Sequence, residues 1–474
     1  MPPLSSAVAV QTGKTTLVIK RLTGSFSGEG YQARALRGSM MTMVNFGGHN
    51  ALRLGSNLIL TRILFPEAFG LMALVQVVLA ATAMFSDFGI TGSIVQHRRG
   101  EDPDFLNTAW TVQIGRGTML GLAVALMAQP LAIFYDEPQL GQLLLFAGIV
   151  PFIQGFNSTR MATMNRKIML GRMTMLGLST QAFGIVVMVV LAWITGSVWS
   201  LIVGTAAGAF ALMLLSHVAL PGTIRNRPHF EREAARDLFG YGKYVFLATL
   251  AGFFVQHGDR AILGKYITLE ELAIYNIGFF MATIPIKFAR GLNASVIFPL
   301  YARRPPAESD ENRRRINRAR FLLTGVLVAG TALLGLIGNA LIVALYDPRY
   351  EGGGPILALI AISLLPQLVT PSYERLPLSV GRSGLYAFFV VTRSVILLTL
   401  MVLGVSHLGL LGVVLAPLVT WALVYPILIW TIRRFSGWDP VHDAIYALLT
   451  FALSAALLVY HWETVRPLLT PLLG

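Results

Sequence analysis

The chain contains no cysteine among its 474 residues. Disulfide bonds, thiolate metal sites and catalytic thiols are therefore excluded. Charged residues are also scarce, at 13% of the chain, whereas soluble domains carry about 25%. After the first 37 residues, no hydrophilic stretch is long enough to form a globular domain. These scarcities argue against a soluble enzyme.

Apolar residues are abundant instead. Hydrophobic residues make up 55% of the chain, and the mean hydropathy is +0.65. A membrane helix needs about 20 mostly apolar residues. We therefore predict an all-α polytopic membrane protein with helices at 39–62, 67–95, 105–134, 139–164, 170–195, 198–220, 238–264, 271–300, 316–346, 353–380, 384–405, 409–432 and 441–461.

These helices divide into two bundles of six, followed by one or two extra C-terminal helices. Residues 463–474 are too short to span a membrane, and their status stays open. The predicted organisation is a disordered cytoplasmic tail (1–37), a first lobe (38–220), a cytoplasmic linker (221–237), a second lobe (238–435), and a C-terminal extra helix and tail (436–474).

Cations exceed acids, with 37 Lys and Arg against 23 Asp and Glu. Nucleic-acid binding is one explanation for this excess, but the cations fall on alternate loops, which the positive-inside rule explains better. They lie at Arg98–Arg99, Arg166–Lys167, Arg225–Arg236, Arg303–Arg315, Arg382 and Arg433–Arg434. This pattern predicts a cytoplasmic N-terminus and no nucleic-acid partner.

One sequence pattern occurs twice. Residues 60–73 (LTRILFPEAFGLMA) are echoed by residues 263–276 (LGKYITLEELAIYN), so that Arg62 matches Lys265 and Glu67 matches Glu270. Each copy reads as the outer end of one helix, a short turn and the start of the next. A repeat at fixed spacing indicates two related halves. In many transporters such halves enclose the substrate site.

Polar residues recur at helical spacing inside apolar segments. The predicted helix 39–62 carries one such stripe, and helix 271–300 carries another; their members are Asn45, His49, Arg53, Ser56 and Asn57, and Asn276, Thr283, Lys287 and Arg290. Steps of three and four place each set on one face. Because ionisable groups at membrane depth cost about 2.5–3.5 kcal/mol each, they usually face a cavity. We therefore expect a water-filled cleft between the lobes.

Cations predominate among these residues, which suits an anionic cargo, because Arg binds phosphate through paired, charge-assisted hydrogen bonds. The candidate cargo-binding residues are Arg53, Arg116, Arg260, Lys287, Arg290 and Arg393. The candidate ion-coupling residues are Asp87, Asp259, Glu374 and His49. No cofactor or metal site is predicted, and the acids leave open coupling to a proton or sodium gradient.

Structural roles compete with these assignments. Lys287, Arg290 and Arg375 could extend from inner helix ends toward the headgroups. Asp259 and Arg260 could form a structural ion pair with neighbours, and His49 could be a satisfied polar residue. The sequence leaves these alternatives open.

The repeated turn, the segment 259–267 (DRAILGKYI) and Asn165–Ile168 resemble the polysaccharide transporter family over about residues 38–435. More closely, the chain is similar to the Wzx-type flippases for O-antigen and exopolysaccharide repeat units. They belong to the multidrug/oligosaccharidyl-lipid/polysaccharide exporter superfamily, which includes the MATE transporters. The resemblance implies two six-helix lobes around a cationic cavity that opens alternately to each side.

The implied cargo is an undecaprenyl-diphosphate-linked oligosaccharide, moved across the bacterial inner membrane. The implied partners are membrane lipids and, further, a polysaccharide polymerase and a chain-length regulator. Two alternatives are an ion-coupled drug antiporter and a peptidoglycan lipid II flippase of the same superfamily. A membrane enzyme that joins sugars is disfavoured, because the outer loops are short and carry no His/acid constellation.

Overall fold

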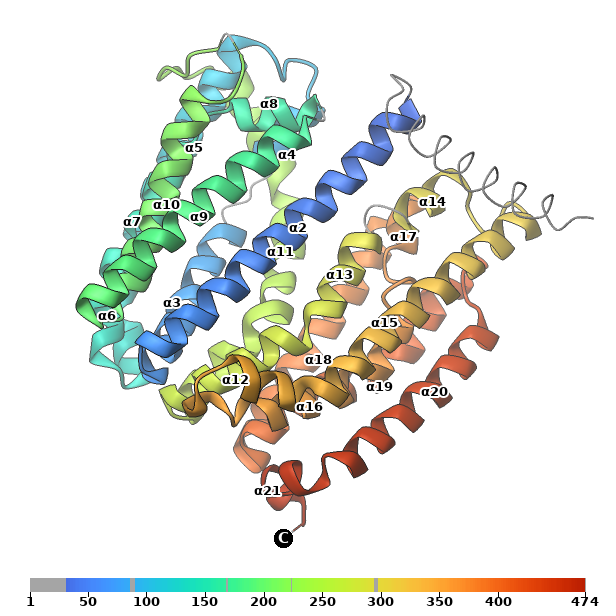
Figure 1. Cartoon of the computed structure of the whole chain (residues 1–474). Coiled ribbons are helices and arrows are strands. Elements are labelled where there is room, and N and C mark those ends of the chain that lie inside the picture. The colour runs from blue at the N-terminus through green and yellow to red at the C-terminus, as the bar shows by residue number, and fades with distance from the viewer. Residues whose placement is uncertain (1–30, 86–89, 168, 223, 294–296, 474) are drawn as a thin grey trace, which may run out of the picture.

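A computed structural model of the protein describes residues 31–85, 90–167, 169–222, 224–293 and 297–473 (Figure 1). Every regular element in these ranges is a helix. The first half contains α2 (Tyr31–Ile63), α3 (Pro66–Phe85), α4 (Ile90–Gln96), α5 (Pro103–Tyr135), α6 (Pro138–Ala147), α7 (Ile149–Gly155), α8 (Arg160–Arg166), α9 (Leu170–Thr195) and α10 (Trp199–Val218).

The second half contains α11 (Arg232–Tyr266), α12 (Leu269–Ala282), α13 (Ile284–Leu292), α14 (Phe298–Arg303), α15 (Asp310–Leu345), η2 (Pro348–Tyr350), α16 (Gly353–Leu364), η3 (Leu365–Val369), α17 (Leu376–Ser379), α18 (Ser383–Leu408), α19 (Leu410–Arg433), α20 (Pro440–Tyr460) and α21 (Trp462–Leu473). The predicted all-α polytopic fold is confirmed.

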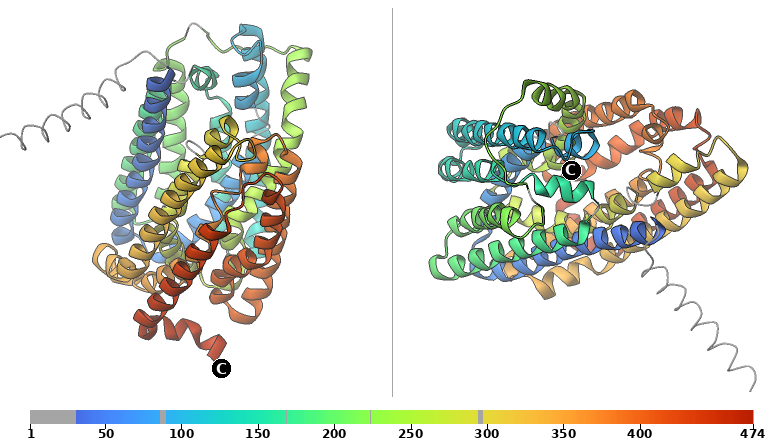
Figure 2. Two further views of the ribbon diagram at one scale, coloured as in Figure 1. Left: turned by 90° about the vertical axis from the view of Figure 1, so that its right-hand side faces the viewer. Right: turned by 90° about the horizontal axis from the view of Figure 1, so that it is seen from above.

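The helices form two bundles that lie side by side. Seen from above, α5–α10 occupy one side and α16–α20 the other (Figure 2). The ribbons diverge toward the end that carries α4, α8, α14 and α17 and meet at the opposite end (Figure 1). The α2–α3 and α11–α12 turns lie at that meeting end, which we call the outer end after the predicted topology.

Nine helices in the described ranges are long and apolar enough to cross a membrane, or up to ten if a bent pair counts as one span. The predicted helices missing from this set correspond to α2, α11 and the segment α12–α14. The segment α12–α14 is divided into helices of 14, 9 and 6 residues, each shorter than a membrane span.

Three predicted helices are broken. Residues 139–164 form α6, α7 and α8, with a bend of 59° before α8. Residues 271–300 form α12, α13 and α14, and residues 353–380 form α16, η3 and α17. Pro151, Pro285 and Pro366 lie in these segments, and a proline inside a helix removes one backbone hydrogen bond and clashes with the preceding turn. The apolar composition predicted each span, and the interruptions fall in the segments that contain these prolines.

The ends of the chain also differ from prediction. Helix α2 begins at Tyr31, within the segment predicted as a disordered tail, and residues 1–30 lie outside the described residues. The 12-residue helix α21 follows α20 after a turn at His461. At about 1.5 Å per residue it is too short to span a membrane.

The repeated turns have the predicted form. Arg62 lies in the last turn of α2 and Glu67 in the first turn of α3. Lys265 and Glu270 occupy the corresponding positions at the end of α11 and the start of α12. A cation at a helix C-terminus and an acid at an N-terminus each complement the helix dipole. Thr268 and Glu271 add a reciprocal capping box at the start of α12.

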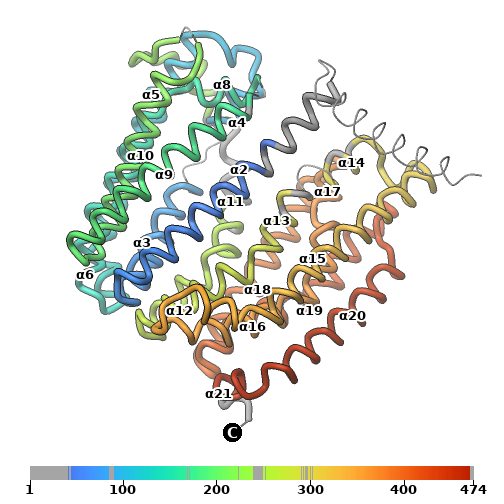
Figure 3. The backbone as a smooth tube through the Cα atoms, in the orientation of Figure 1, coloured from blue at the N-terminus to red at the C-terminus, as the bar shows by residue number. Residues whose placement is uncertain are grey.

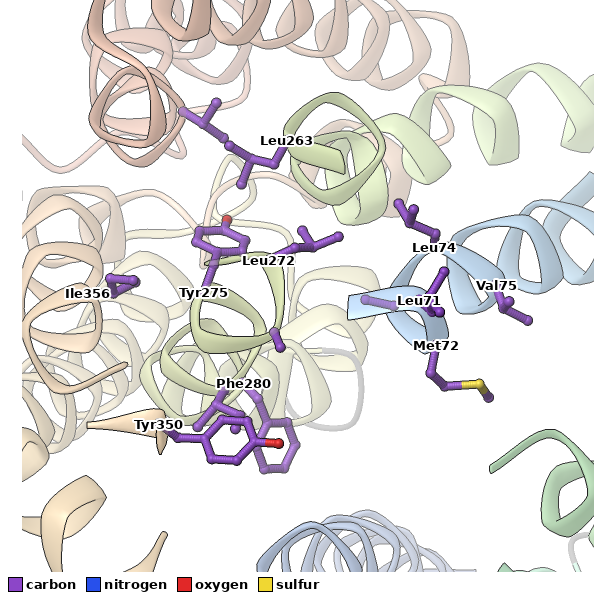
Figure 4. Packing of buried hydrophobic residues seen from close by; sticks show 14 of the residues in the cluster. Leu71, Met72, Leu74, Val75, Leu263, Leu272, Tyr275, Phe280, Tyr350 and Ile356 are labelled. Carbon is purple, nitrogen blue, oxygen red and sulfur yellow. The ribbon is translucent and has the colours of Figure 1, made fainter. Parts of the chain in front are cut away.

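The two turns also pack together at the outer end. Leu71 and Leu74 of α3 belong to one buried cluster with Leu263 of α11 and Tyr275 of α12 (Figure 4). Gly70 lies so close to the backbone of Leu269 that a Cβ atom there would clash with it. Small residues permit this close approach of helices in a membrane. The two copies of the repeat therefore form the junction between the halves.

The predicted linker, 221–237, lies against the first bundle (Figure 3). Three of its backbone amides donate hydrogen bonds to side-chain oxygens near the start of α5: Arg227 to Asn107 (3.0 Å), His229 to Thr111 (2.9 Å) and Glu231 to Thr108 (3.1 Å). Ala234 and Leu238, in the first turns of α11, are buried with residues of α4, α5 and α8. The chain therefore crosses to the second bundle within α11.

Candidate functional site

A cavity of about 620 Å³ lies among the first-half helices and reaches α12. We call it the first-half cavity, and its polar lining residues are His49, Arg53, Ser56, Asn57, Gln76, Gln154, Thr180, Gln181, Thr205 and Asn276. Four members of the predicted α2 stripe are included. His49 Nδ1 hydrogen-bonds Gln181 Oε1 of α9, and Gln181 Nε2 donates to the His49 carbonyl at 3.1 Å. His49 is thus a partnered polar residue of the cavity wall.

A second cavity, of about 240 Å³, lies between the halves. This middle cavity is lined by Gln256, His257, Asp259 and Arg260 of α11, Lys287 of α13 and Arg393 of α18. Arg53, Ala73 and Gln76 line both this cavity and the first-half cavity. The two spaces therefore share a wall, and Arg53 is exposed to both.

Two cations from different halves contact the same aromatic ring. The guanidinium carbon of Arg53 lies 4.8 Å from the centre of the Phe280 ring, and Lys287 Nζ lies 5.1 Å from it. A cation over an aromatic face gains about 0.5–2 kcal/mol, more when it is desolvated. Phe280 thus holds two like charges near each other, one from each half.

Arg260 is held by neutral groups. Its Nε donates to Asn276 Oδ1 at 2.8 Å, and its guanidinium lies 4.6 Å from the centre of the Phe279 ring. Within the described part of the chain, neither Arg53 nor Arg260 pairs with a carboxylate. Their positive charges are positioned but not neutralised.

Asp259 and Arg260 are neighbours in sequence but have different hydrogen-bond partners. Asp259 is buried, and its Oδ2 accepts a hydrogen bond from the Tyr275 hydroxyl at 2.8 Å. Its Oδ1 is buried without a partner among the described residues. The alternative of an Asp259–Arg260 ion pair is not observed. An unsatisfied buried carboxylate oxygen is costly, which keeps Asp259 a candidate for binding a proton or a coupling ion.

A third cavity, of about 290 Å³, lies inside the second half. This second-half cavity shares Gln256, Ile286, Gln367, Arg393 and Pro417 with the middle cavity. Here Arg393 Nη1 forms an ion pair with Glu374 Oε1 at 2.6 Å. The three cavities thus form a row, with shared wall residues at both junctions.

The structure does not bring every candidate into this row. Arg116 lines a separate, mostly apolar pocket with Ile90, Phe230 and Leu238. Arg290 belongs to α13, but its side chain lies outside the described residues, as does the whole of Asp87. The row therefore contains Arg53, Arg260, Lys287, Arg393, Asp259, Glu374 and His49. Their role in binding or coupling stays a prediction.

Two features of the second half were not predicted. Trp421 and Tyr425 line the second-half cavity; their i, i+4 spacing after Pro417 was the available signal. Arg320 of α15 is 1% exposed, lies 3.9 Å from the Tyr373 ring centre and donates to the Tyr301 hydroxyl at 2.7 Å. Arg320 follows closely after the basic loop that ends at Arg315, and no periodic pattern in the sequence distinguishes it from the cations of that loop.

At the outer end, the row is closed by contacts between the halves. Arg349 Nη2, after α15, donates to the Thr61 carbonyl at the end of α2 (3.2 Å). Its guanidinium also lies 5.2 Å from the centre of the Phe65 ring. The fully buried Tyr350 packs edge-on against Phe69 of α3, with ring centres 5.9 Å apart. The bundles are therefore joined on this side and separated on the other.

Comparison with known proteins agrees with this architecture. The chain is 23% identical over 347 residues to the succinoglycan biosynthesis transport protein ExoT of Rhizobium meliloti, covering 71% of this chain and 67% of ExoT. It is 22% identical over 417 residues to the lipopolysaccharide biosynthesis protein WzxC of Escherichia coli, covering 84% and 83%. It is 21% identical to the probable low-salt glycan biosynthesis flippase Agl15 of Haloferax volcanii, covering 76% and 75%.

Two solved structures share the fold. The lipid II flippase MurJ in an inward closed conformation aligns with a TM-score of 0.65 at 11% identity, covering 91% of this chain and all of that one. An inward-facing MATE transporter of the MOP superfamily aligns with a TM-score of 0.59 at 15% identity, covering 81% and 94%. Residues 59–350, more than half of the chain, match a family described as polysaccharide biosynthesis protein. The chain belongs to this family of polysaccharide biosynthesis proteins and has the fold of the MOP superfamily.

Proposed function

We propose that this protein is a flippase for oligosaccharides linked to a lipid through a diphosphate, as in undecaprenyl-diphosphate-linked repeat units. The observation that carries the proposal is the charge of the row of joined cavities. Among the described residues of its walls, the cations are Arg53, Arg260, Lys287, Arg375 and Arg393, and the acids are Asp259 and Glu374. Net positive charge in a confined polar space favours an anionic headgroup.

The chemistry of the row matches the parts of such a cargo. Arg53 and Arg260 have donors that are free of carboxylates in the described structure, and a hydrogen bond to a charged group contributes about 1.5–3 kcal/mol. Two or three such contacts would offset the cost of desolvating a diphosphate. The lipid chain stays in the bilayer, and the two bundles alternate between openings on the inner and outer sides.

The relatives support this substrate class by their names, which include a succinoglycan transport protein and a glycan flippase. The proposed location is the bacterial inner membrane, with the N-terminus in the cytoplasm, because basic loops alternate along the chain. A polysaccharide polymerase and a chain-length regulator are the proposed protein partners. Asp259, whose Oδ1 has no partner in the described part of the chain, is the proposed site of coupling to a proton or sodium gradient.

The test is transport of a labelled lipid-linked repeat by the purified protein in liposomes. Arg53→Ala and Arg260→Ala should each lower the initial rate at least ten-fold, while Arg434→Ala, an exposed cation outside the cavities, should leave it unchanged. Equal rates in all three variants would refute the cationic site. Repeating the assay with and without a proton or sodium gradient identifies the coupling ion.

The same liposomes separate the two alternatives. A drug antiporter would move a cationic dye against the gradient, which the cation excess opposes. A lipid II flippase would accept lipid II at least as well as the polysaccharide repeat. Either result would replace the proposed cargo.

A further inference from the structure

The wall of the second-half cavity combines aromatic and amide side chains. The aromatic residues are Tyr386, Trp421 and Tyr425, and the amides are Asn293 and Gln367. Tryptophan and tyrosine offer an apolar face together with a polar edge. Aromatic faces pack against the C–H groups of a pyranose ring, and amides bind its hydroxyls as both donors and acceptors.

Two residues of this wall each have a buried polar atom with no hydrogen-bond partner among the described residues. Asn293 is 5% exposed; its Nδ2 donates to the Pro371 carbonyl, but its Oδ1 has no partner in the described structure. Trp421 Nε1 is likewise buried without a partner among the described residues. Buried polar groups are satisfied in the great majority of cases, so such atoms call for an explanation. Both residues line the cavity, so small side-chain rotations as a ligand enters would bring this acceptor and this donor to a ligand hydroxyl, which both accepts and donates.

The charges in this cavity do not cancel. Arg393 is paired with Glu374 at 2.6 Å. Arg375 lines the same cavity and has no carboxylate partner among the described residues. One positive charge is therefore left over at this wall, and a guanidinium binds a carboxylate through two parallel hydrogen bonds.

We propose that the second-half cavity is a subsite for one acidic sugar residue of the cargo. The carboxylate of a uronic acid binds Arg375, its ring packs on the aromatic wall, and its hydroxyls bind Asn293 Oδ1 and Trp421 Nε1. A volume of about 290 Å³ lies at the small end of ligand sites, about 300 Å³ and above, and therefore admits one sugar rather than a whole repeat unit.

The position of the cavity fits this role, which rests on the proposed flippase function. Gln256, Gln367 and Arg393 line both the second-half cavity and the middle cavity. A diphosphate at Arg53 and Arg260 would thus have a sugar-binding wall next to it in the second half. The charge on Arg375 would select among repeat units that all carry the same diphosphate.

The experiment measures binding of two small probes to the purified full-length protein in nanodiscs by saturation-transfer NMR. The probes are methyl glucuronide, with neutral methyl glucoside as its comparison, and inorganic diphosphate. Methyl glucuronide should bind at least ten-fold more tightly than methyl glucoside. Arg375→Ala should remove this preference, and Arg375→Lys should restore part of it. Arg382→Ala, which changes an exposed cation on the other side of α17, should not alter the preference.

Trp421→Phe tests the indole N–H and the aromatic ring separately, because it removes the N–H and keeps a ring. This variant keeps an aromatic face, so it should weaken both sugars by a few-fold without altering the acidic preference. Arg53→Ala should weaken diphosphate and leave methyl glucuronide unaffected.

The two probes make the outcomes distinguishable. Diphosphate binding without glucuronide binding, or equal binding of the two sugars to wild type and Arg375→Ala, overturns the acidic-sugar subsite while the flippase proposal stands. Glucuronide binding that depends on Arg375, without any diphosphate binding, supports the subsite and counts against the cationic headgroup site.

Discussion

Gly70 of α3 lies directly against the backbone of Leu269 at the start of α12, so closely that a side chain at position 70 would overlap it. The contact joins the first copy of the repeated turn to the second. Any atom added at position 70 would therefore push the two turns apart at the outer junction.

Gly70→Ala should therefore weaken the outer junction. Overpacking a tight site costs about 1–3 kcal/mol, and here the obstacle is backbone, which cannot rotate away. We expect a lower melting temperature in detergent and a population shifted toward outer opening. Gly330→Ala is the control, because a Cβ atom at Gly330 meets nothing within 4 Å. Equal melting temperatures for the two variants would contradict the contact.

Arg349 should hold the outer side closed. Its loss removes a hydrogen bond to the Thr61 carbonyl and a contact with the Phe65 ring. Because the chain has no native cysteine, a single thiol at Ser56, buried in the wall of the first-half cavity, reports outer access cleanly. Arg349→Ala should raise labelling of that thiol from the outer side several-fold, and Arg349→Lys should raise it less. No change in labelling would show that other contacts close this side.

The attachment of the linker to the first bundle should depend on pH. Arg99 hydrogen-bonds both carboxylate oxygens of Glu231, at 2.7 and 2.8 Å, and Asp102 at 3.1 Å. These contacts lower the pKa of Glu231, and the adjacent Asp104 amide and Arg99 lower the pKa of Asp102. A carboxyl group whose pKa is lowered in the folded protein contributes its full stabilisation at a pH above its ordinary pKa. This contribution is lost as the pH falls from the ordinary pKa through the lowered pKa.

The ordinary values are 4.5 for Glu231 and 3.8 for Asp102, so the attachment should be constant at neutral pH and weaken below about pH 4. Hydrogen exchange of residues 224–231, measured at matched chemical exchange rates, checks this. In the Arg99→Gln variant, the amides of this segment should exchange faster at neutral pH, and their exchange rate should change less when the pH is lowered. A wild-type segment equally protected at pH 7 and pH 3.5 would contradict the prediction.

Asp443 should anchor α20 to the second bundle. Its carboxylate accepts hydrogen bonds from the hydroxyls of Tyr373 and Tyr425, each at 2.6 Å, and from Trp438 Nε1 at 3.1 Å. Removing the acceptor leaves buried donors unsatisfied, at about 1–3 kcal/mol each. Asp443→Ala should therefore destabilise the protein by several kcal/mol, on the order of the sum for two donors.

Asp443→Asn, which keeps one acceptor oxygen, should cost less than Asp443→Ala. Thermal unfolding in detergent measures both variants. Tyr425 also lines the second-half cavity, so Asp443→Ala should in addition weaken sugar binding there. Equal stability of Asp443→Ala and wild type would show that α20 is held by apolar contacts alone.

The sequence by itself determined the class of protein, the repeat and the polar faces of α2 and α11–α13, because hydropathy, fixed spacing and helical period are local properties that survive in one dimension. Only the tertiary structure decided which charges share a space. Arg53 and Lys287 meet over Phe280, Arg116 lies in another pocket, and Glu374 pairs with Arg393 across a break at η3 and α17. These relationships depend on how helices distant in sequence cross and where prolines interrupt them, and no single helical period encodes either.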